Sequence, residues 1–213
     1  MKLWSYWRSS SAYRVRIALG LKGLPFEYVP VHLVREGGQQ HQADFATVNP
    51  LRQVPVLEVE DGNDTIRLVQ SMAIIEYLDE RFPEPPLLPQ SARGRAHVRA
   101  MAETVNAGIQ PLQNTDTFAE LKKHAIEPEA WARIFIAKGL AALEALATEH
   151  AGAFLFEDRV SLADVYLVPQ LYNARRWGVS LEPFPTLTRA DANAQALPAF
   201  QAAAPNAQPD AEP

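Results

Sequence analysis

Three consecutive serines, Ser9, Ser10 and Ser11, follow a short strand-like segment (residues 2–6) and precede apolar residues at helical spacing that continue to Gly23. A helix N-terminus presents unpaired backbone N–H groups and a partial positive charge, so a hydroxyl there can help to hold a bound thiol as its thiolate. The alternative is that these serines only cap the helix, which is among the commonest local features. The sequence predicts a helix that begins at the serines and leaves both roles open.

The protein has no sulfur nucleophile of its own. Its 213 residues contain no cysteine, which excludes disulfides, thiolate metal sites and a cysteine nucleophile. The serines also lack the Gly-x-Ser-x-Gly surroundings of a hydrolase nucleophile, and none of the five histidines is placed by sequence to act as their base. Any thiol chemistry must therefore use a bound thiol, and we expect no metal site.

Two further positions could bind a ligand. Gln70 and Ser71 lie where a strand ends and a helix begins, an arrangement that binds a carboxylate or phosphate on backbone amides or is an ordinary helix cap. Val54-Pro55 precedes another strand, and a cis bond there would turn the Val54 backbone outward to pair with an extended peptide. A trans proline at an edge strand is the alternative.

In the first half of the chain, these positions lie on predicted strands and helices that alternate along the sequence. Residues 26–32 are rich in β-formers and are predicted to pair beside the first strand, which gives a βαβ unit. Residues 54–59 and 66–69 are predicted to form a β-hairpin around Asp61-Gly62, followed by a helix over 71–82.

The second half of the chain is predicted to be helical. After the proline cluster at 83–86, alanine-rich and leucine-rich segments at 93–109 and 129–149 replace the strands. Ser161 and Asp164 have the spacing of an N-terminal capping box, and we assign Asp164 to folding. We therefore expect an α/β domain over residues 1–83 and an all-helical domain over 89–213, with a loosely ordered, proline-containing tail from about residue 205.

Charge and hydropathy limit the classes of partner that the protein can have. The net charge is −5, and the basic residues are scattered, so we expect neither nucleic acid nor a membrane surface as the partner. The N-terminus runs into a strand without a signal-like apolar stretch, and no window resembles a membrane span. We expect a cytoplasmic protein whose partner is a small molecule or another protein.

Taken together, the motifs resemble those of the zeta-class glutathione transferases, a family that includes maleylacetoacetate isomerase. The run from Ser9 to Leu19 resembles the serine-rich signature of their first helix. The resemblance spans both halves of the chain and continues through Gly37-Gly38-Gln39-Gln40, Asn49-Pro50, Gln53-Val54-Pro55, Gln70-Ser71, Ala73-Ile74-Ile75-Glu76-Tyr77-Leu78, Gln110-Pro111-Leu112-Gln113-Asn114, Leu167-Val168-Pro169-Gln170 and Gln208-Pro209-Asp210.

The resemblance implies a glutathione transferase fold, with an α/β thioredoxin-like N-terminal domain and an all-α C-terminal helical domain, as well as a homodimer and glutathione as cofactor. It implies that Ser9 faces the glutathione sulfur with Ser10 and Ser11 beside it, and that Arg8 and Arg176 bind the substrate. The positions that resemble the glutathione-binding residues of the family are Gln40, Val54, Pro55, Gln70, Ser71, Gln110 and Asn114.

The function implied by the resemblance is the glutathione-dependent cis–trans isomerisation of maleylacetoacetate, a dicarboxylate, to fumarylacetoacetate in tyrosine and phenylalanine catabolism. The alternatives are the same chemistry on maleylpyruvate in gentisate breakdown, a broader transferase acting on small haloacids, and a non-catalytic binding module. Many family members carry cysteine where this chain has Ser11, so side reactions ascribed to that cysteine are in doubt here.

Overall fold

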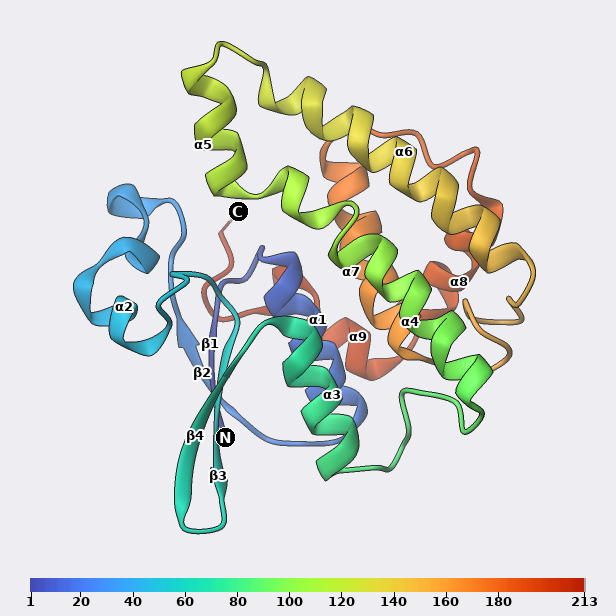
Figure 1. Cartoon of the computed structure of the whole chain (residues 1–213), viewed down its shortest axis with the longest axis horizontal. Coiled ribbons are helices and arrows are strands. Elements are labelled where there is room, and N and C mark those ends of the chain that lie inside the picture. Colours follow the sequence, from blue (N-terminus) through green and yellow to red (C-terminus); the bar gives the residue numbers. More distant parts are fainter. Residues whose placement is uncertain (213) are drawn as a thin grey trace. The chain divides into compact units, whose positions relative to one another are not determined.

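The computed structural model of the chain describes residues 1–212, which form two compact units (Figure 1). The first unit comprises Met1–Pro85 together with residues 198–212, and the second is Pro86–Leu197. Each unit has its own buried apolar core. Within residues 1–212, no helix combines the length and the apolar character needed to cross a bilayer.

The first unit is built around a four-stranded mixed sheet. Its strand order is β2 (Glu27–Pro30), β1 (Lys2–Ser5), β3 (Val56–Asp61), β4 (Asp64–Val69). β1 pairs parallel with β2 and antiparallel with β3, and β3 pairs antiparallel with β4. These pairings confirm the predicted βαβ unit and the predicted hairpin, and with them the α/β half of the fold.

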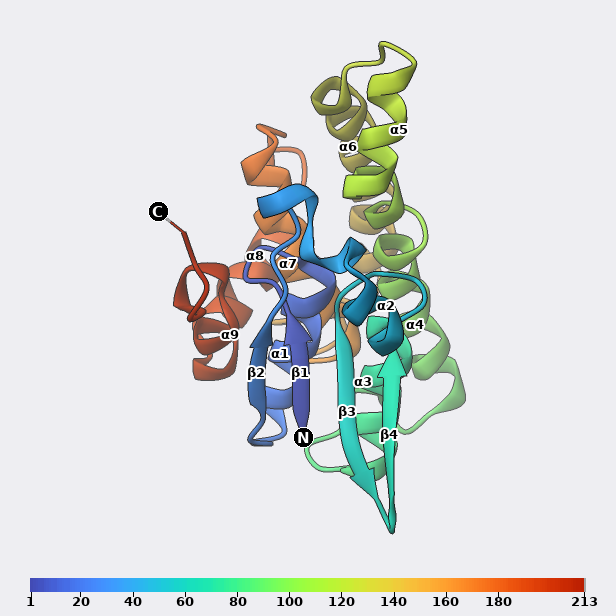
Figure 2. The same cartoon turned by 90° about the vertical axis from the view of Figure 1, so that its left-hand side faces the viewer.

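Opposite faces of this sheet carry different apolar clusters, because successive side chains of a strand point to opposite sides. Leu3 and Leu57 are in register and have no exposed surface, on the face covered by α1 (Ser10–Leu21) and α3 (Ser71–Arg81) (Figure 2). Trp4 and Val56 lie on the other face, in a cluster that includes Phe45 of α2 (Ala43–Val48). Two short 3-10 turns, η1 (Arg35–Gly37) and η2 (Gln39–His41), connect β2 to α2.

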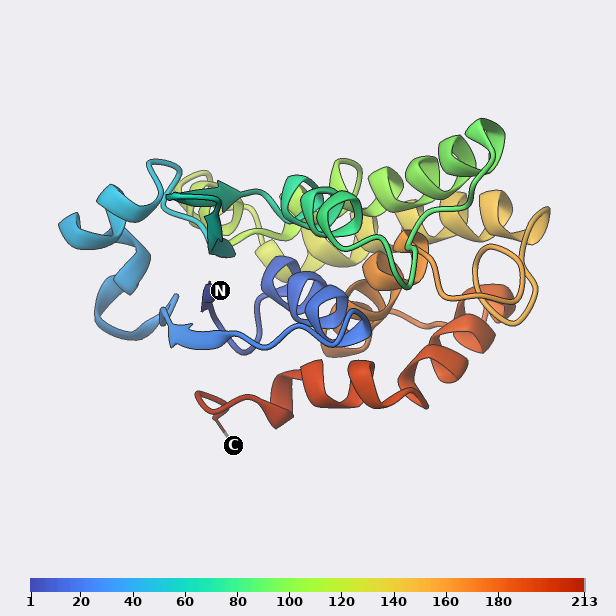
Figure 3. The ribbon, with the colours of Figure 1, turned by 90° about the horizontal axis from the view of Figure 1, so that it is seen from below.

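The last α-helix of the described residues, α9 (Pro198–Ala203), packs along α1 (Figure 3). A Cβ atom added to Gly20 of α1 would lie 3.3 Å from the Cβ of Ala199, so glycine at this position permits the close approach of the two helices. Phe200 is 1% exposed and belongs to the core of the first unit. The chain then continues through η4 (Pro205–Ala207).

This placement differs from the predicted domain boundaries, which put residues 89–213 in one helical domain and left a loosely ordered tail from about 205. In the structure, residues 198–212 belong to the first unit, and Pro205 is buried. Asp210 accepts hydrogen bonds from the backbone N–H of Trp7 (3.1 Å) and from Tyr28 (2.6 Å). Composition favoured disorder, but polar contacts with residues far away in sequence determine the position of this segment.

The second unit is helical throughout its regular structure, apart from one isolated bridge between Ala151 and Glu157. This confirms the predicted helical half. α7 is central, since most of its residues are buried and it contacts α4, α6 and α8. The elements are α4 (Ala92–Asn106), η3 (Gln110–Gln113), α5 (Thr115–Lys123), α6 (Pro128–Thr148), α7 (Leu162–Arg176) and α8 (Pro185–Gln195).

Candidate active site

Four of the predicted ligand-binding segments start from the same edge of the sheet. β1, β2 and β4 run in one direction and β3 runs in the other, so the ends of the first three and the start of β3 lie together. The serine segment follows β1, the loop with Gln40 follows β2, Val54 precedes β3, and Gln70-Ser71 follows β4. Strand direction therefore brings together residues that are far apart in sequence.

Ser9 is the N-cap of α1. Its φ and ψ of −70° and 119° are extended, and its Oγ accepts a hydrogen bond from the backbone N–H of Ala12 at 3.2 Å. This confirms that the serines open the helix. A hydroxyl carries one hydrogen as well as its lone pairs, so Oγ can accept from Ala12 and still donate to an anion. The capping role and the thiolate-binding role are therefore compatible in one residue.

The neighbours of Ser9 differ in exposure. Ser10 is the first residue of α1 and is 8% exposed, whereas Ser9 and Ser11 are only half-buried. The guanidinium of Arg8 lies over the ring of Trp7, with its Cζ atom 5.1 Å from the ring centroid. Of the first two serines, Ser9 is thus the more accessible to a ligand.

The N-terminus of α3 is the second candidate binding point. Gln70 has a φ of 69°, in the left-handed region that residues other than glycine rarely adopt, and Ser71 begins the helix. Such backbone outliers are concentrated at ligand-binding sites. The buried guanidinium of Arg14 donates to Ser71 Oγ (3.3 Å), so α1 and α3 are also joined by a polar contact.

Gln40, in η2, is 4% exposed, and its Nε2 donates to the carbonyl of Leu33 at 3.3 Å. Its Oε1 is buried and has no hydrogen-bond partner among residues 1–212. Buried polar atoms are almost always paired, so this oxygen is a candidate acceptor for a ligand N–H group. Gly38 makes room for the side chain, because a Cβ atom there would lie 2.6 Å from Gln40 Nε2.

The Val54-Pro55 peptide bond is cis, as the sequence interpretation allowed. Val54 is 7% exposed, and its side chain belongs to the same apolar cluster as Trp7, two residues before Ser9. The residue before the cis bond and the residues just before the serines therefore pack in a common cluster.

The remaining predicted residues lie in the second unit. Gln110 Nε2 donates to Asn114 Oδ1 at 2.5 Å, across the 3-10 turn η3. Asn114 is the N-cap position of α5. The structure thus brings these two amides into direct contact.

Arg176 is the last residue of α7 and is exposed. Its Cζ lies 4.6 Å from the centroid of the Trp177 ring, which in turn packs edge-on against Phe118 of α5 at 5.3 Å between centroids. The backbone N–H of Phe118 donates to the carbonyl of Asn114, the N-cap of α5, at 2.9 Å. Arg176 therefore lies on an aromatic contact between the end of α7 and α5.

Comparison with known proteins identifies the family. Residues 1–80 match the family model described as glutathione S-transferase, N-terminal domain, and residues 128–208 match the model described as glutathione S-transferase, C-terminal domain. Maleylacetoacetate isomerase of Mus musculus is 45% identical over 98% of this chain and 94% of its own length. A solved structure described as maleyl pyruvate isomerase, a bacterial glutathione S-transferase in the zeta class, is 43% identical, with a TM-score of 0.93 and complete coverage of both chains.

The chain belongs to the zeta-class glutathione transferase family. A second solved structure, maleylacetoacetate isomerase from Anaeromyxobacter dehalogenans 2CP-1, is 56% identical to this zeta-class chain. It has a TM-score of 0.92 and covers 99% of this chain and 97% of its own. That protein was crystallised with glutathione bound in its active site. The predicted family and fold class are thereby confirmed.

A buried amide network of this zeta-class chain was not assigned any role from the sequence. Gln113 Nε2 of η3 donates to Gln170 Oε1 of α7 at 2.7 Å, and Asn173 Nδ2 donates to Gln113 Oε1 at 3.4 Å. The network fixes the turn that carries Gln110 and Asn114 to the central helix. The signals in the sequence were that Gln113 and Gln170 stand in motifs of the family resemblance and that polar Gln170 and Asn173 interrupt the apolar positions of a helix.

Proposed function

We propose that this protein is a glutathione-dependent cis–trans isomerase that converts maleylacetoacetate to fumarylacetoacetate. The observation that carries the proposal is the half-buried Ser9 hydroxyl at the N-terminus of α1, since the segments with Gln40, Val54 and Ser71 adjoin the same edge of the sheet. Relatives named maleylacetoacetate isomerase, 45% identical over nearly the whole chain, support the choice of reaction.

Glutathione fits the residues at this edge. The unpaired Gln40 Oε1 can accept from an amide N–H of the tripeptide, and the Val54 backbone can pair with it in extended form. The γ-glutamyl carboxylate suits Ser71 and the first backbone amides of α3, where the helix dipole is positive. In the second unit, we assign Gln110 and Asn114 to the same ligand.

Bound glutathione supplies a thiolate that adds reversibly to the conjugated double bond, which can rotate as a single bond before the thiolate leaves. Ser9 donates its hydroxyl hydrogen to the sulfur anion, and the N-terminus of α1 adds a positive potential. Arg8 and Arg176 bind the carboxylates of the acid, because a guanidinium can bind a carboxylate through two hydrogen bonds. Their positive charges also stabilise the negative charge that develops on the substrate oxygen. Without a cysteine in the chain, no enzyme thiol competes for the substrate.

The test is a rate assay with purified protein. Maleylacetoacetate should isomerise only when glutathione is present, and the glutathione concentration should be unchanged at the end because it is regenerated. S-Methylglutathione, which has no free thiol, is the control and should support no turnover. Equal rates with and without glutathione would refute the proposal, and stoichiometric loss of glutathione would indicate a conjugating transferase.

Maleylpyruvate is the second candidate substrate. It is favoured by the maleyl pyruvate isomerase structure, which covers this chain completely with a TM-score of 0.93. The chemistry is the same on a shorter acid, so the two substrates differ only in how well they fit beside Arg176 and its neighbours. The ratio of kcat/KM for the two acids, measured in one preparation, decides between them.

Arg176→Ala is expected to lower kcat/KM for the acid substrate by about 10-fold to 100-fold, since it removes charge-assisted hydrogen bonds to a carboxylate. Arg176→Lys should restore only part of this loss, because lysine cannot bind a carboxylate in the same bidentate geometry. Steady-state kinetics at saturating glutathione measure both. Arg189→Ala, at an exposed arginine of α8, is the matched control and should leave kcat/KM unchanged.

We also propose a homodimer in the cytoplasm. Membership of the family supports the dimer, and sedimentation of the purified protein tests it. The cytoplasm is the compartment in which reduced glutathione is maintained, which the reaction requires.

A further inference from the structure

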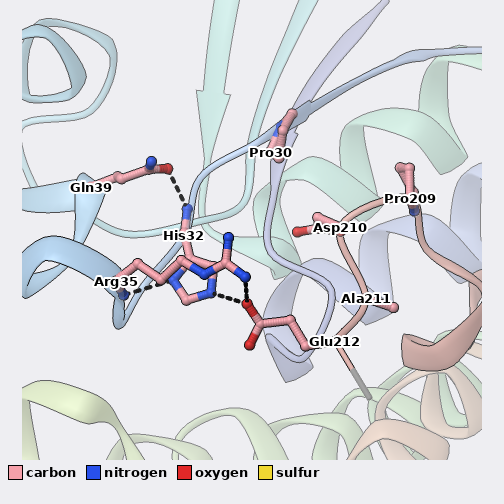
Figure 4. Close-up of a pocket in the computed structure, with 8 residues that line it drawn as sticks. All are labelled: Pro30, His32, Arg35, Gln39, Pro209, Asp210, Ala211 and Glu212. Atoms are coloured by element: carbon pink, nitrogen blue, oxygen red, sulfur yellow. Dashed lines mark hydrogen bonds and ion pairs between the residues drawn. The ribbon is translucent and has the colours of Figure 1, made fainter.

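Two carboxylates near the C-terminus of the described chain are bound to the loops that carry Ser9 and Gln40. Asp210 Oδ2 accepts from the backbone N–H of Trp7 at 3.1 Å, and its Oδ1 accepts from Tyr28 Oη at 2.6 Å. Glu212 Oε1 contacts His32 Nε2 at 3.1 Å and also pairs with the guanidinium of Arg35 (Figure 4). We call residues 210–212 the acidic segment.

Asp210 binds the backbone of Trp7, which lies beyond the end of the sheet. Trp7 lies two residues after the end of β1 (Lys2–Ser5), so its N–H and C=O need partners other than a neighbouring strand. Asp210 supplies the acceptor for the N–H, and the buried guanidinium of Arg16 donates to the Trp7 carbonyl at 2.9 Å. Arg16 also donates to the carbonyls of Tyr6 (3.3 Å) and of Ala203, beside the acidic segment in sequence (3.0 Å).

These bonds determine the position of Ser9. The backbone N–H of Ser9 donates to the Tyr6 carbonyl at 3.0 Å, the same oxygen that accepts from Arg16. Burial lowers the pKa of Arg16 to about 10, so the guanidinium remains charged at neutral pH. With Trp7 fixed at both its N–H and its C=O, the turn between β1 and α1 has little freedom.

Glu212 binds the loop that follows β2 and carries Gln40. His32 Nδ1 accepts from the backbone N–H groups of Arg35 (2.8 Å) and Val34 (3.2 Å), so Nε2 carries the proton that is donated to Glu212. The backbone N–H of His32 donates to Gln39 Oε1 at 2.7 Å (Figure 4). Gln40 is the next residue, so the histidine bound by Glu212 also holds the start of the turn that presents Gln40.

Ala211, between the two carboxylates, packs against the apolar cluster that includes Trp7 and Val31. The acidic segment and the loop after β2 line a hollow of about 370 Å³ (Figure 4). The segment is therefore fixed by one apolar contact and by polar bonds on either side of it, so its two carboxylates can be tested separately.

We infer that Asp210 and Glu212 are positioning residues, Asp210 for the Ser9 hydroxyl and Glu212 for the Gln40 amide. This inference rests on the proposed function, in which Ser9 stabilises the thiolate and Gln40 binds the tripeptide. Its distinctive consequence is that neighbouring carboxylates control different kinetic parameters: Asp210 controls kcat, and Glu212 controls the affinity for glutathione.

For Asp210→Ala we expect kcat to fall about 10-fold to 100-fold, because small displacements of a catalytic group have effects of this size. The pKa of the thiol of bound glutathione, followed by its ultraviolet absorbance, should rise by about one unit as the hydroxyl moves away from the sulfur. KM for glutathione should change less than about 3-fold. Asp210→Asn should restore most of kcat, since its oxygen can still accept from Trp7 and its amide can donate to Tyr28.

For Glu212→Ala we expect KM and the calorimetric Kd for glutathione to rise about 3-fold to 10-fold, with kcat unchanged. This is the pattern expected when the lost interaction stabilises the ground state and the transition state equally. In the protein without glutathione, amide hydrogen exchange over residues 32–42 should accelerate, while exchange at Trp7 should not. Glu60→Ala, at an exposed carboxylate of β3, is the matched control and should change neither kinetics nor exchange.

The opposite results overturn the inference. If Asp210→Ala keeps both kcat and the thiol pKa, or if both variants lower kcat and raise KM alike, the acidic segment has only a structural role. Tyr28→Phe provides an independent check, because it removes one of the two hydrogen bonds to Asp210 and should reproduce part of the Asp210→Ala effect. If the unsubstituted protein binds glutathione but isomerises neither acid, the proposed function fails while the thiol titration still tests Asp210. Absence of glutathione binding overturns both.

Discussion

Ser9→Ala is expected to lower kcat by about one to three orders of magnitude, which is the usual effect of removing a hydrogen-bond donor to a developing anion. The variant loses the hydroxyl hydrogen that we assign to the sulfur, while the glutathione-binding groups at Gln40 and Ser71 remain. Kd for glutathione should therefore change little, and the pKa of its bound thiol should rise. Steady-state kinetics and a thiol titration measure the two effects.

The control for this variant must separate catalysis from helix capping. Ser9 Oγ also accepts from the Ala12 N–H, so its loss should cost about 1 kcal/mol of stability. Ser91 caps α4 in the same way, accepting from the Gly94 N–H at 3.0 Å, and Ser91→Ala should lose similar stability without losing activity. Unchanged turnover in Ser9→Ala would move the activating role elsewhere, and Ser10→Ala would be the next variant to measure.

Asp164→Ala is expected to lower the free energy of unfolding by about 3–5 kcal/mol, because it leaves several buried donors without an acceptor. Asp164 has no exposed surface. Its carboxylate accepts from the backbone N–H of Leu155 (2.9 Å), the backbone N–H of Ser161 (2.8 Å) and the Ser161 hydroxyl (2.9 Å). Denaturant unfolding at one fixed protein concentration measures the loss.

Asp158→Ala is the matched control. Asp158 is an exposed carboxylate near the same turn, and it accepts one hydrogen bond, from the Ala153 N–H at 2.8 Å. Its removal should cost no more than about 1 kcal/mol. Equal losses for the two variants would show that the Asp164 network contributes no more than an ordinary surface cap.

The contribution of Asp164 should also depend on pH. Burial raises its pKa from the ordinary value of 3.8 to about 6, although its hydrogen bonds act in the opposite direction. Between these two values Asp164 is protonated more in the folded protein than in the unfolded chain, so its contribution to the free energy of unfolding falls as pH rises from about 4 to about 6, by up to about 3 kcal/mol. Asp164→Asn cannot titrate. The stability advantage of the unsubstituted protein over this variant should therefore be larger at about pH 4.5 than at about pH 7, and an equal advantage at both would contradict the assignment.

Local signals in the sequence were sufficient for most elements. Alternating β-formers on both sides of Asp61-Gly62 specify a hairpin, and the proline cluster at 83–86 must end a helix, because turn geometry and the missing N–H of proline act within a few residues. The capping box of Ser161 and Asp164 is equally local and begins α7 as predicted. The serine segment at the start of α1 was predictable for the same reason.

The tertiary structure decided the environment of those elements. No local pattern relates Asp210 to Trp7, which is 203 residues away in sequence, or Arg16 to the Ala203 carbonyl, which is 187 residues away. Composition alone indicated a loose tail, since prolines and few large apolar residues favour disorder. The sequence by itself determined most of the elements and the family, and it supplied the candidate site residues, because these depend on local chemistry and on motif. Only the fold determined that residues 198–212 pack on the N-terminal unit and bind its loops, because single polar contacts between distant residues have no periodicity from which they could be predicted.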